Sequence, residues 1–376
     1  MNKIDTEHLV LTKKDNCDTC KTYQYLRSSS PTMVKLQTGL VLKYDCDLCE
    51  ITESGSSAIN TIINNIHIYN KFEKFNIMLS NQVYSSTPKI VKYFCNTFAQ
   101  TSIIHLFDVE NIDQLLMLFT QCVDQNNILF IESCSNSFGK IFDFELIPKL
   151  KLQSKKLYVV VDNTWLTEEI FNPFKFDVDF VVVSLTKYYS AGNAIGGAIL
   201  SKKVNDNNDN NDNNDNKLIM SGIKEFNKMS GMHVSPDTCK IIISNMSNIK
   251  SRINKSSKLT LQWFTYCETN KHPNLISIIH PYFKNHKSNH LMEKYFNQNL
   301  IPSVFLITIK SKPTLIMKKL KKCTIFDFKT SFGYKHSRFD PFCFNIGELT
   351  HVRISIGYDD GMDIIINGIN ELLDQC

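Results

Sequence analysis

Short apolar runs alternate with amphipathic segments through the first half of the chain. Five such runs are FNIMLSN, TSIIHLF, NILFIES, LYVVVDN and DFVVVSL. Between them lie segments with the helical spacing of apolar residues, such as NIDQLLMLFTQCVDQ. Short strands that are apolar on both faces and alternate with helices are typical of a mostly parallel sheet covered on both sides. The pattern therefore predicts an α/β fold.

Helical patterns lie on both sides of this alternating region. Residues 33–50 read as one amphipathic helix, and residues 54–69 read as a second helix that begins after Ser and Gly. From Leu218 onward the sequence pattern changes, with long helical patterns over residues 239–270. Two strands, SVFLITI and HVRISIG, and a last helix in MDIIINGINELLDQ follow. This change predicts a smaller second α/β domain.

We therefore expect three parts in the chain. Residues 1–30 form an N-terminal arm, residues 31–217 a large domain, and residues 218–376 a small C-terminal domain. The tract NDNNDNNDNNDN at residues 205–216 has no apolar side chains to bury, so it is predicted to be a solvated loop of the large domain.

Composition and charge place the chain among ordinary soluble proteins. Of its 376 residues 43% are hydrophobic and 21% are charged, and the net charge of +5 comes from lysines spread along the chain. This charge does not indicate nucleic-acid binding. The N-terminus has no apolar leader region, and no stretch approaches the length of a membrane-spanning helix. We expect a cytoplasmic protein with no membrane or nucleic-acid partner.

The twelve cysteines are scattered, which favours reduced thiols over a disulfide framework. Two CxxC pairs occur, Cys17 with Cys20 and Cys46 with Cys49. Such thiolate pairs are typical zinc ligands. Alternatively, Cys46 and Cys49 lie on the apolar face of the helix expected over residues 33–50, where a buried thiol acts as a small apolar side chain.

Polar residues end two neighbouring apolar runs. Asp162 follows the run VVV, and Lys187 follows the run VVVSLT twenty-five residues later. Ligands of open α/β sheets bind beyond the carboxyl ends of the strands, although burying an ammonium group there is costly. Either Lys187 extends to the surface, or it forms a Schiff base while the acid pairs with a protonated ring nitrogen. The second combination is how pyridoxal phosphate is held.

The region VVVDNTW followed by SLTKYYSAGNAIGG resembles the signature of the Cys/Met-metabolism (trans-sulfuration) family of pyridoxal-phosphate enzymes. The resemblance extends from about Tyr25 to the C-terminus. It implies a type I PLP-dependent transferase fold, with a large αβα domain around a mostly parallel sheet and a small C-terminal α/β domain. It also implies that Lys187 is the Schiff-base lysine and Asp162 the partner of the ring nitrogen. Ser184 and Thr186 would donate to the phosphate.

Two further motifs would complete the phosphate site. YLRSSSPT resembles the family motif Y-[ST]-R-x-x-N-P-T, in which Tyr25 and Arg27 would reach the cofactor phosphate of the neighbouring subunit. ESGSSAI resembles the loop whose backbone N–H groups bind the phosphate at a helix N-terminus, which places Gly55 and Ser56 there. A residue that serves the neighbour requires at least a dimer, and the resemblance implies a homotetramer made of two dimers.

Four other residues are matched by motifs at the ring and at the substrate. VYSSTPK implies that Tyr84 stacks on the cofactor ring and assists proton transfer. IESCSNSF implies that Asn136 contacts the ring oxygen. HVRISIG implies that Arg353 binds the α-carboxylate of an amino-acid substrate, and SFGYKHSRFDP implies that Ser331 lies near it.

The chain departs from the family pattern at several of these motifs. Family glycines are replaced in the tyrosine motif, family prolines in the asparagine motif, and a glycine and a glutamate near the substrate; the residues found there are Ser85, Ser86, Cys134, Ser137, Tyr334 and His336. The last two indicate either a changed substrate wall or drift in the active site.

The resemblance implies a pyridoxal-phosphate-dependent carbon–sulfur lyase of sulfur amino-acid metabolism, similar to cystathionine β-lyase or γ-lyase. One alternative is a γ-replacement enzyme similar to cystathionine γ-synthase or O-acetylhomoserine sulfhydrylase. Another is a non-catalytic protein that keeps the fold. The resemblance also assigns the cysteine pairs to a helix and to the N-terminal arm, so we expect no metal.

Overall fold

The structure, a computed structural model, describes residues 25–202, 215–297, 299–341, 344–346 and 349–376. The chain divides by its contacts into two compact units. Unit 1 contains the chain up to Ser133 together with Phe142–Glu168 and Asn172–Ser247. Unit 2 contains Cys134–Ile141, Glu169–Phe171 and Asn248–Cys376.

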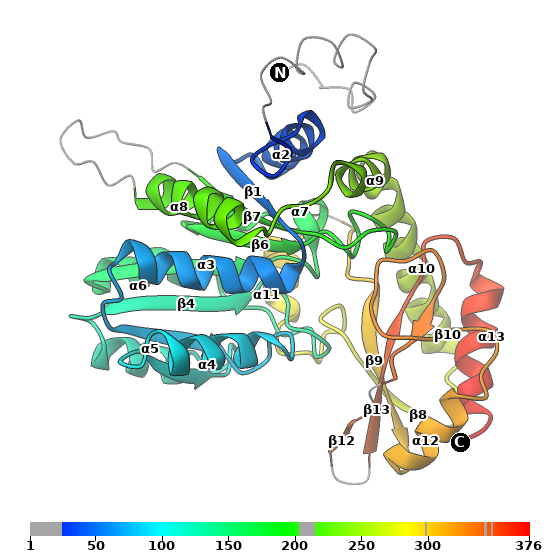
Figure 1. The fold of residues 1–376 in the computed structure, drawn as a ribbon. Helices are drawn as coiled ribbons and strands as arrows, with labels where there is room; N and C mark the ends of the chain where they lie inside the picture. The colour runs from blue at the N-terminus through cyan, green and yellow to red at the C-terminus, as the bar shows by residue number, and fades with distance from the viewer. Residues whose placement is uncertain (1–24, 203–214, 298, 342–343, 347–348) are drawn as a thin grey trace. The chain divides into compact units, whose positions relative to one another are not determined.

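Unit 1 is built on a seven-stranded sheet with the strand order β1-β7-β6-β5-β4-β2-β3 (Figure 1). Its strands are β1 (Leu48–Thr52), β2 (Phe75–Ser80), β3 (Ile103–Phe107), β4 (Asn126–Glu132), β5 (Lys156–Asp162), β6 (Phe180–Ser184) and β7 (Gly197–Ser201). The strands β6, β5, β4, β2 and β3 are parallel to one another in this order across the sheet. Strand β7 pairs antiparallel with both β6 and β1. The five apolar runs are thus strands of a mostly parallel sheet, which confirms that prediction.

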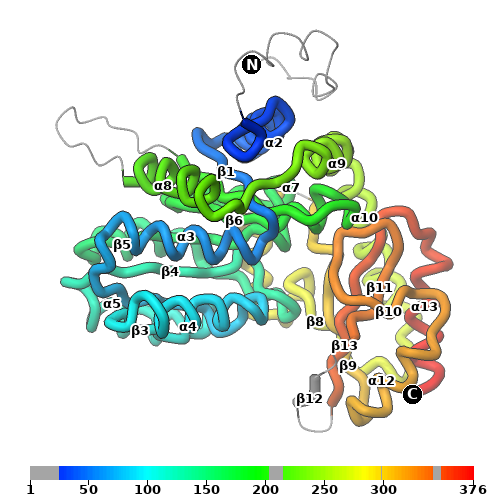
Figure 2. The backbone as a smooth tube through the Cα atoms, viewed as in Figure 1, coloured from blue at the N-terminus to red at the C-terminus, as the bar shows by residue number. Residues whose placement is uncertain are grey.

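Helices cover this sheet. They are α2 (Pro31–Tyr44), α3 (Gly55–Tyr69), α4 (Thr87–Thr97), α5 (Ile112–Gln121), α6 (Leu146–Gln153), the short α7 (Thr167–Ile170) and η2 (Pro173–Lys175), α8 (Asp215–Ser230) and α9 (Pro236–Met246). Helices α3 and α8 lie side by side (Figure 2). Apolar residues of α3, α4 and α8 share one buried core with β2, β4, β5 and β6. Helices α5 and α6 contact each other and the strands β3 and β5.

The helix expected over residues 33–50 is wrong in its second part. Helix α2 ends at Tyr44, and Asp45 follows in the left-handed conformation with φ of 51°. The chain then enters strand β1, where Cys49 is buried and pairs with Leu200 of β7. The assignment of Cys46 and Cys49 to the apolar face of a helix is therefore wrong as well. Over most of β1 the side chains alternate between partly exposed and buried positions, which is the pattern of a strand and not of a helix.

The predicted loop at residues 205–216 is wrong at its C-terminal end. Most of the tract lies outside the described residues, but Asp215 begins helix α8. Its carboxylate accepts hydrogen bonds from Tyr69 at 2.7 Å and Tyr158 at 2.9 Å, and it lies 2.9 Å from the ammonium of Lys156. An acid in the first turn of a helix is favoured by the helix dipole, and these partners fix it there.

Unit 2 is built on a second sheet with the order β10-β11-β13-β9-β8, and β12 pairs with β13. Its strands are β8 (Leu275–Ile279), β9 (Val304–Lys310), β10 (Asp327–Phe328), β11 (Arg338–Phe339), β12 (Phe344–Ile346) and β13 (Leu349–Ser355). Its helices are α10 (Ile249–Thr269), α11 (Asn289–Tyr295), α12 (Pro313–Leu320) and α13 (Met362–Leu373). The strands expected in SVFLITI and HVRISIG are β9 and β13, which pair antiparallel.

The large and small α/β parts are as predicted in class. The boundaries expected from the sequence stay a prediction. The two units do not follow these boundaries, because α8 and α9, most of which was expected in the small domain, belong to unit 1. None of the helices in the described ranges has the length and apolar character needed to cross a bilayer.

Candidate active site

The residues expected at the site fall in both units, and each set is described within its own unit. In unit 1 the central residue is Asp162, the last residue of β5, which pairs in register with Val182 of β6. Its side chain is buried and accepts a hydrogen bond from the backbone N–H of Thr164 at 2.9 Å. Burial raises the pKa of Asp162, whereas the bond from Thr164 and the charge of Lys187 lower it. Asp162 and Lys187 therefore interact electrostatically.

Lys187 lies in the connection between β6 and β7, and hydrogen bonds hold this connection closed at its base. The N–H of Leu185 donates to the carbonyl of Gly196 at 2.9 Å. The N–H of Gly196 donates to the hydroxyl of Thr186 at 3.2 Å, and the carbonyl of Thr186 accepts from Gly192 at 3.1 Å. Thr186, which the resemblance assigns to the phosphate, thus also shapes the loop that carries Lys187.

Ser184 and the N-terminus of α3 approach each other closely. A Cβ atom added to Gly55 would lie 2.8 Å from Cβ of Ser184, so only glycine fits at this position. Ser54 caps the helix by accepting a hydrogen bond from the N–H of Ser57 at 3.1 Å. The N–H groups at Gly55 and Ser56 thereby begin a helix beside a serine hydroxyl. A helix N-terminus with an adjacent hydroxyl is suited to a phosphate.

Tyr84 and Ser184 are each positioned by a residue that the sequence reasoning did not assign to the site. The backbone N–H of Tyr84, in the loop between β2 and α4, donates to a carboxylate oxygen of Glu132 at 2.5 Å. Tyr84 is 41% exposed. The N–H of Ser184 donates to the hydroxyl of Thr164 at 2.8 Å. Glu132 stands in the quoted motif IESCSNSF and Thr164 in the quoted signature VVVDNTW, but neither was assigned a role.

Asn163, the residue after Asp162, belongs to a buried polar network. Its side-chain oxygen accepts from the hydroxyl of Ser133 at 2.6 Å, and its amide donates to the hydroxyl of Tyr44 at 3.2 Å. Tyr44 is the last residue of α2 and Ser133 directly follows β4, so these bonds hold the residue after Asp162 to two other elements of unit 1.

Tyr25 and Arg27 lie together at the N-terminal edge of the described chain. The guanidinium of Arg27 lies 5.0 Å from the centre of the Tyr25 ring. It also donates to the carbonyl of Lys228, in the last turn of α8, at 2.6 Å. Tyr25 is 56% exposed. The two residues thus form a pair on the surface of unit 1, and their role in a neighbouring subunit stays a prediction.

In unit 2, Arg353 and Asn136 meet although they are far apart in sequence. Arg353 lies on β13 opposite Leu306 of β9. Its guanidinium donates to the side-chain oxygen of Asn136 at 2.9 Å and to the hydroxyl of Thr330 at 3.3 Å, and it forms an ion pair with Asp340. Burial lowers the pKa of Arg353, while the carboxylate of Asp340 raises it. Asp340 stands in the quoted motif SFGYKHSRFDP, which assigned it no role.

The residues that depart from the family pattern have partners of their own in unit 2. The ring of Tyr334 lies 3.4 Å from the guanidinium carbon of Arg338, and Nδ1 of His336 lies 3.0 Å from a carboxylate oxygen of Asp360. Ser331 has φ of 93°, a left-handed conformation that costs a non-glycine residue energy. These contacts give the Tyr334 and His336 side chains defined positions.

The thiols of the described CxxC pair are not poised to bind a metal. Burial raises the pKa of Cys46 to about 12, and burial also raises the pKa of Cys49. Zinc binds the thiolate form, which these surroundings disfavour. Cys17 and Cys20 lie outside the described residues. Across the described part of the chain, no group of three or more His, Cys, Asp or Glu side chains is placed to hold a metal ion.

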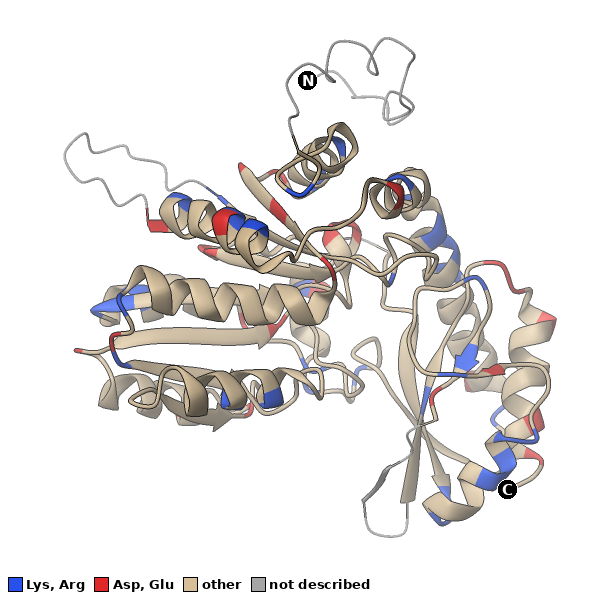
Figure 3. Ribbon diagram, viewed as in Figure 1, with Lys and Arg blue, Asp and Glu red and all other residues tan. Residues whose placement is uncertain are grey.

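The positions of lysine and arginine are spread over several elements, and both basic and acidic positions occur on α8 and α9 (Figure 3). This mixed pattern agrees with the spread of positive charge along the sequence.

The mostly parallel sheet, the N-terminus of α3 beside the Ser184 hydroxyl, the acid that ends β5 and the lysine that follows β6 are features that a pyridoxal-phosphate-dependent enzyme requires. The chain matches the family described as "Cys/Met metabolism PLP-dependent enzyme" over residues 6–344. It belongs to this family.

Individual relatives are distant. The chain is 28% identical to a protein named putative cystathionine gamma-lyase 2 of Caenorhabditis elegans over 50% of its length and 46% of the relative's. It is 22% identical to the cystathionine gamma-lyase of Dictyostelium discoideum over 94% of its length and 88% of the relative's. For three curated relatives the matched part spans 46%, 63% and 38% of the relative, about half of their length.

Solved structures show the same fold. One is a protein named putative O-acetylhomoserine (thiol)-lyase, from Campylobacter jejuni, with a pyridoxyl-lysine phosphate; its TM-score is 0.79, with 23% identity over 92% of this chain and 87% of that one. Another is the cystathionine gamma-lyase from yeast, with a TM-score of 0.77 and 20% identity over 94% of this chain and 88% of that one.

The residues of unit 1 suit pyridoxal phosphate. Because Gly55 has no Cβ, the N-terminus of α3 can lie close to Ser184. The N–H groups of this helix end and the Ser184 hydroxyl are donors suited to an anion. The buried carboxylate of Asp162 suits a protonated ring nitrogen, and Lys187 supplies an amine for an aldehyde. These donors, the acceptor and the amine are the kinds of group that the phosphate, the ring nitrogen and the aldehyde of pyridoxal phosphate require.

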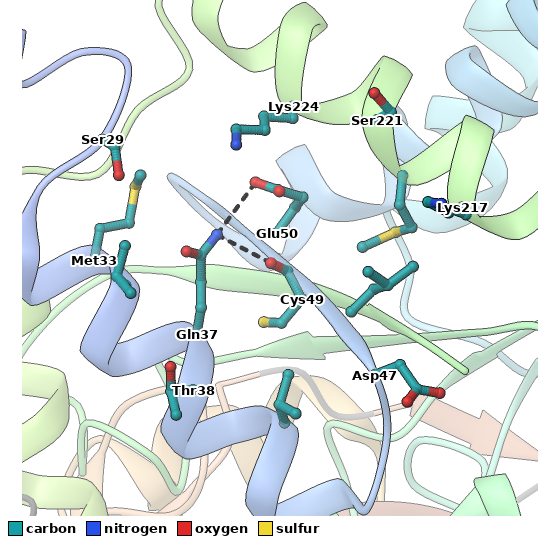
Figure 4. Close-up of a pocket in the computed structure, with 14 residues that line it drawn as sticks. Ser29, Met33, Gln37, Thr38, Asp47, Cys49, Glu50, Lys217, Ser221 and Lys224 are labelled. Atoms are coloured by element: carbon teal, nitrogen blue, oxygen red, sulfur yellow. Dashed lines mark hydrogen bonds between the residues drawn. The ribbon is translucent and has the colours of Figure 1, made fainter. Parts of the chain in front are cut away.

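A separate cavity of about 460 Å³ lies in unit 1 among α2, β1 and α8 (Figure 4). Glu50 faces it, and the amide of Gln37 donates to the Glu50 carboxylate at 3.3 Å and to the carbonyl of Cys49 at 3.0 Å. Burial raises the pKa of Glu50 to about 7, and the charge of Lys224 lowers it. Lys217 and Asp47 also line the cavity.

Replacing Glu50 by Gln is expected to stabilise the protein above pH 7. The folded chain keeps the Glu50 proton up to a pKa of about 7, whereas a free glutamate loses it near 4.5, so stability falls as pH rises through this window. The substitution should remove that fall and raise the free energy of unfolding at pH 8 by roughly 2 kcal/mol. Urea unfolding of the parent protein and the variant at pH 5 and at pH 8 measures the free energy of unfolding and its change with pH. Glu53→Gln, at an exposed position, is the control and should leave the pH dependence unchanged.

Proposed function

We propose that this chain is a pyridoxal-phosphate-dependent carbon–sulfur lyase of sulfur amino-acid metabolism, similar to cystathionine β-lyase or γ-lyase. The observation that supports this most is the interaction of a buried Asp162 with Lys187 beyond β5 and β6, in a chain of the Cys/Met-metabolism family. Relatives with high coverage are named cystathionine gamma-lyase and L-methionine gamma-lyase.

Residues that the family motifs match would hold the cofactor. The backbone N–H groups at Gly55 and Ser56 and the hydroxyls of Ser184 and Thr186 would bind its phosphate. Asp162 would accept from the ring nitrogen, Tyr84 would stack on the ring and Asn136 would contact the ring oxygen. Tyr25 and Arg27 would bind the phosphate held by a neighbouring subunit. When bound, pyridoxal phosphate supplies an electron sink for negative charge at the α-carbon of an amino acid.

The chain's own residues would position the substrate and move its protons. Arg353 would bind the α-carboxylate through its guanidinium, with Ser331 beside it. The amine of Lys187 would remove the proton from the α-carbon, and Tyr84 would assist proton transfer. Asp162 would keep the ring nitrogen protonated, because a carboxylate stabilises the positive charge of its partner. A sulfur leaving group would then depart from the β- or the γ-carbon.

We further propose a cytoplasmic homotetramer built from two dimers. The supporting observation is that Arg27 lies against the ring of the exposed Tyr25, and the resemblance assigns both residues to a neighbouring subunit. Sedimentation analysis should then give several times the chain mass of 43.3 kDa. A species at the single-chain mass, active at every concentration tested, would contradict the shared site.

The products formed from cystathionine test the activity. The purified protein, loaded with pyridoxal phosphate, is expected to release a 2-oxo acid and a thiol. Pyruvate with homocysteine indicates β-cleavage, and 2-oxobutyrate with cysteine indicates γ-cleavage. A γ-replacement enzyme would instead join O-acetylhomoserine to an added thiol without releasing a 2-oxo acid. A protein that binds the cofactor but does neither would be a non-catalytic family member.

A further inference from the structure

The guanidinium of Arg353 already has an anionic partner within unit 2. One terminal nitrogen donates to Asn136, and the other contacts both Asp340 and the hydroxyl of Thr330. The side chains of Arg353 and Asp340 are only 12% and 5% exposed. Both terminal nitrogens are therefore engaged in a mostly buried cluster.

The fold builds this ion pair from two neighbouring strands. Asp340 directly follows β11, which pairs antiparallel with β13. The N–H of Asp340 donates to the carbonyl of Arg353 at 3.0 Å, so the two residues are also joined through their backbones. The hydroxyl of Thr330 donates to the Asp340 carboxylate at 2.8 Å, which fixes its orientation. Asp340 is thus held in place by the fold.

A carboxylate in this position changes what Arg353 offers to a ligand. A guanidinium attracts a carboxylate through its charge and through its paired N–H groups. Here the fixed carboxylate of Asp340 neutralises part of that charge and occupies one of the N–H groups. An incoming α-carboxylate must share the guanidinium with Asp340, and the two negative groups repel each other at short range in a weakly solvated site. The paired arginine should therefore bind carboxylates more weakly than an arginine with neutral partners.

We propose that Asp340 is a specificity-determining residue that weakens the hold of Arg353 on the substrate carboxylate and disfavours substrates with additional negative charge near it. The inference rests on the proposed role of Arg353 in the lyase. The repulsion between Asp340 and the substrate weakens binding of the α-carboxylate, so Asp340 raises KM for zwitterionic amino acids more than it changes kcat. Substrates that carry a second anion beside the α-carboxylate are the most disfavoured.

The variant Asp340→Asn tests this proposal because it removes the charge and keeps a side-chain oxygen for Arg353 and Thr330. Calorimetric titration of the cofactor-loaded protein with butanoate, a carboxylate without an amine, measures binding without turnover. The variant is expected to bind butanoate roughly tenfold more tightly, since one nearby like charge is removed. KM for cystathionine should fall by a similar factor, with kcat changed less. Asp327→Asn, a carboxylate that lies 3.8 Å from Arg338 instead, is the matched control and should behave as the parent protein.

Weaker or unchanged butanoate binding in a folded Asp340→Asn variant would overturn the proposal, because it would show that Asp340 only orients Arg353. Thr330→Val provides a second variant. It removes the hydroxyl that holds the Asp340 carboxylate and should tighten butanoate binding two- to threefold or so; weaker binding would count against the proposal. If the parent protein binds butanoate but does not cleave cystathionine, the lyase activity fails while the effect of Asp340 remains measurable.

Discussion

Replacing Lys187 by alanine is expected to abolish the visible absorbance band of bound pyridoxal phosphate and to lower kcat for cystathionine by about a thousandfold or more. The substitution removes both the amine that would hold the cofactor aldehyde and the base that would take the α-proton. Hydrogen bonds of Leu185 and Thr186 to Gly196 use atoms other than the Lys187 side chain, so the loop should keep its shape. Absorbance spectra with added cofactor and single-turnover assays measure the two effects.

Lys240→Ala is a matched control for this variant. Lys240 is a lysine of the same unit that lies 3.2 Å from Asp237 on the surface of α9, and its side chain is 55% exposed. Its removal should change neither the band nor the turnover. A visible band of unchanged position and intensity in Lys187→Ala would show that another residue holds the cofactor.

Replacing Asp162 by asparagine is expected to lower kcat by roughly 10²- to 10³-fold while the cofactor still binds. An amide can still accept the hydrogen bond from the N–H of Thr164, so the end of β5 should keep its conformation. However, an amide carries no negative charge and cannot keep a ring nitrogen protonated. The electron sink would be weakened, and chemistry would suffer more than binding. Turnover under saturating cofactor and a cofactor titration separate the two effects.

Asp179→Asn is the control for Asp162→Asn because Asp179 is also a buried acid of the same sheet. It lies just before β6, accepts from the N–H of Val159 at 2.8 Å and pairs with Lys151 at 2.9 Å. Its replacement should lower the free energy of unfolding and leave kcat unchanged. If Asp162→Asn retained full kcat with the cofactor bound, Asp162 would have no role at the ring nitrogen.

Local pattern was enough to predict much of the sheet of unit 1. The runs that became β2 to β6 are short and apolar on both faces, which a covered parallel strand requires. The pattern failed at residues 33–50, because apolar residues there fit a helix as well as a strand. The left-handed Asp45 and the pairing of β1 with β7, about 150 residues away, decide the structure. Such pairing leaves no trace in a short window of sequence.

The candidate site divides in the same way. Asp162 and Lys187 could be proposed because each follows an apolar run, and the charge of Lys187 lowers the pKa of Asp162. The roles taken from family motifs stay predictions. Glu132 and Asp340 stand in quoted motifs but were given no role, because their contacts are with residues distant in the chain or on a paired strand. Asp340 stands thirteen residues before Arg353, and only the pairing of β11 with β13 makes them neighbours.

The central claim is that Lys187 holds pyridoxal phosphate, and chemical trapping followed by peptide mapping tests it most directly. Borohydride reduction of the cofactor-loaded protein fixes the cofactor on the lysine that is joined to its aldehyde. After proteolysis, mass spectrometry is expected to locate the pyridoxyl group on the peptide that contains Lys187. A label on a different lysine, or no label on protein that demonstrably binds the cofactor, would contradict the account.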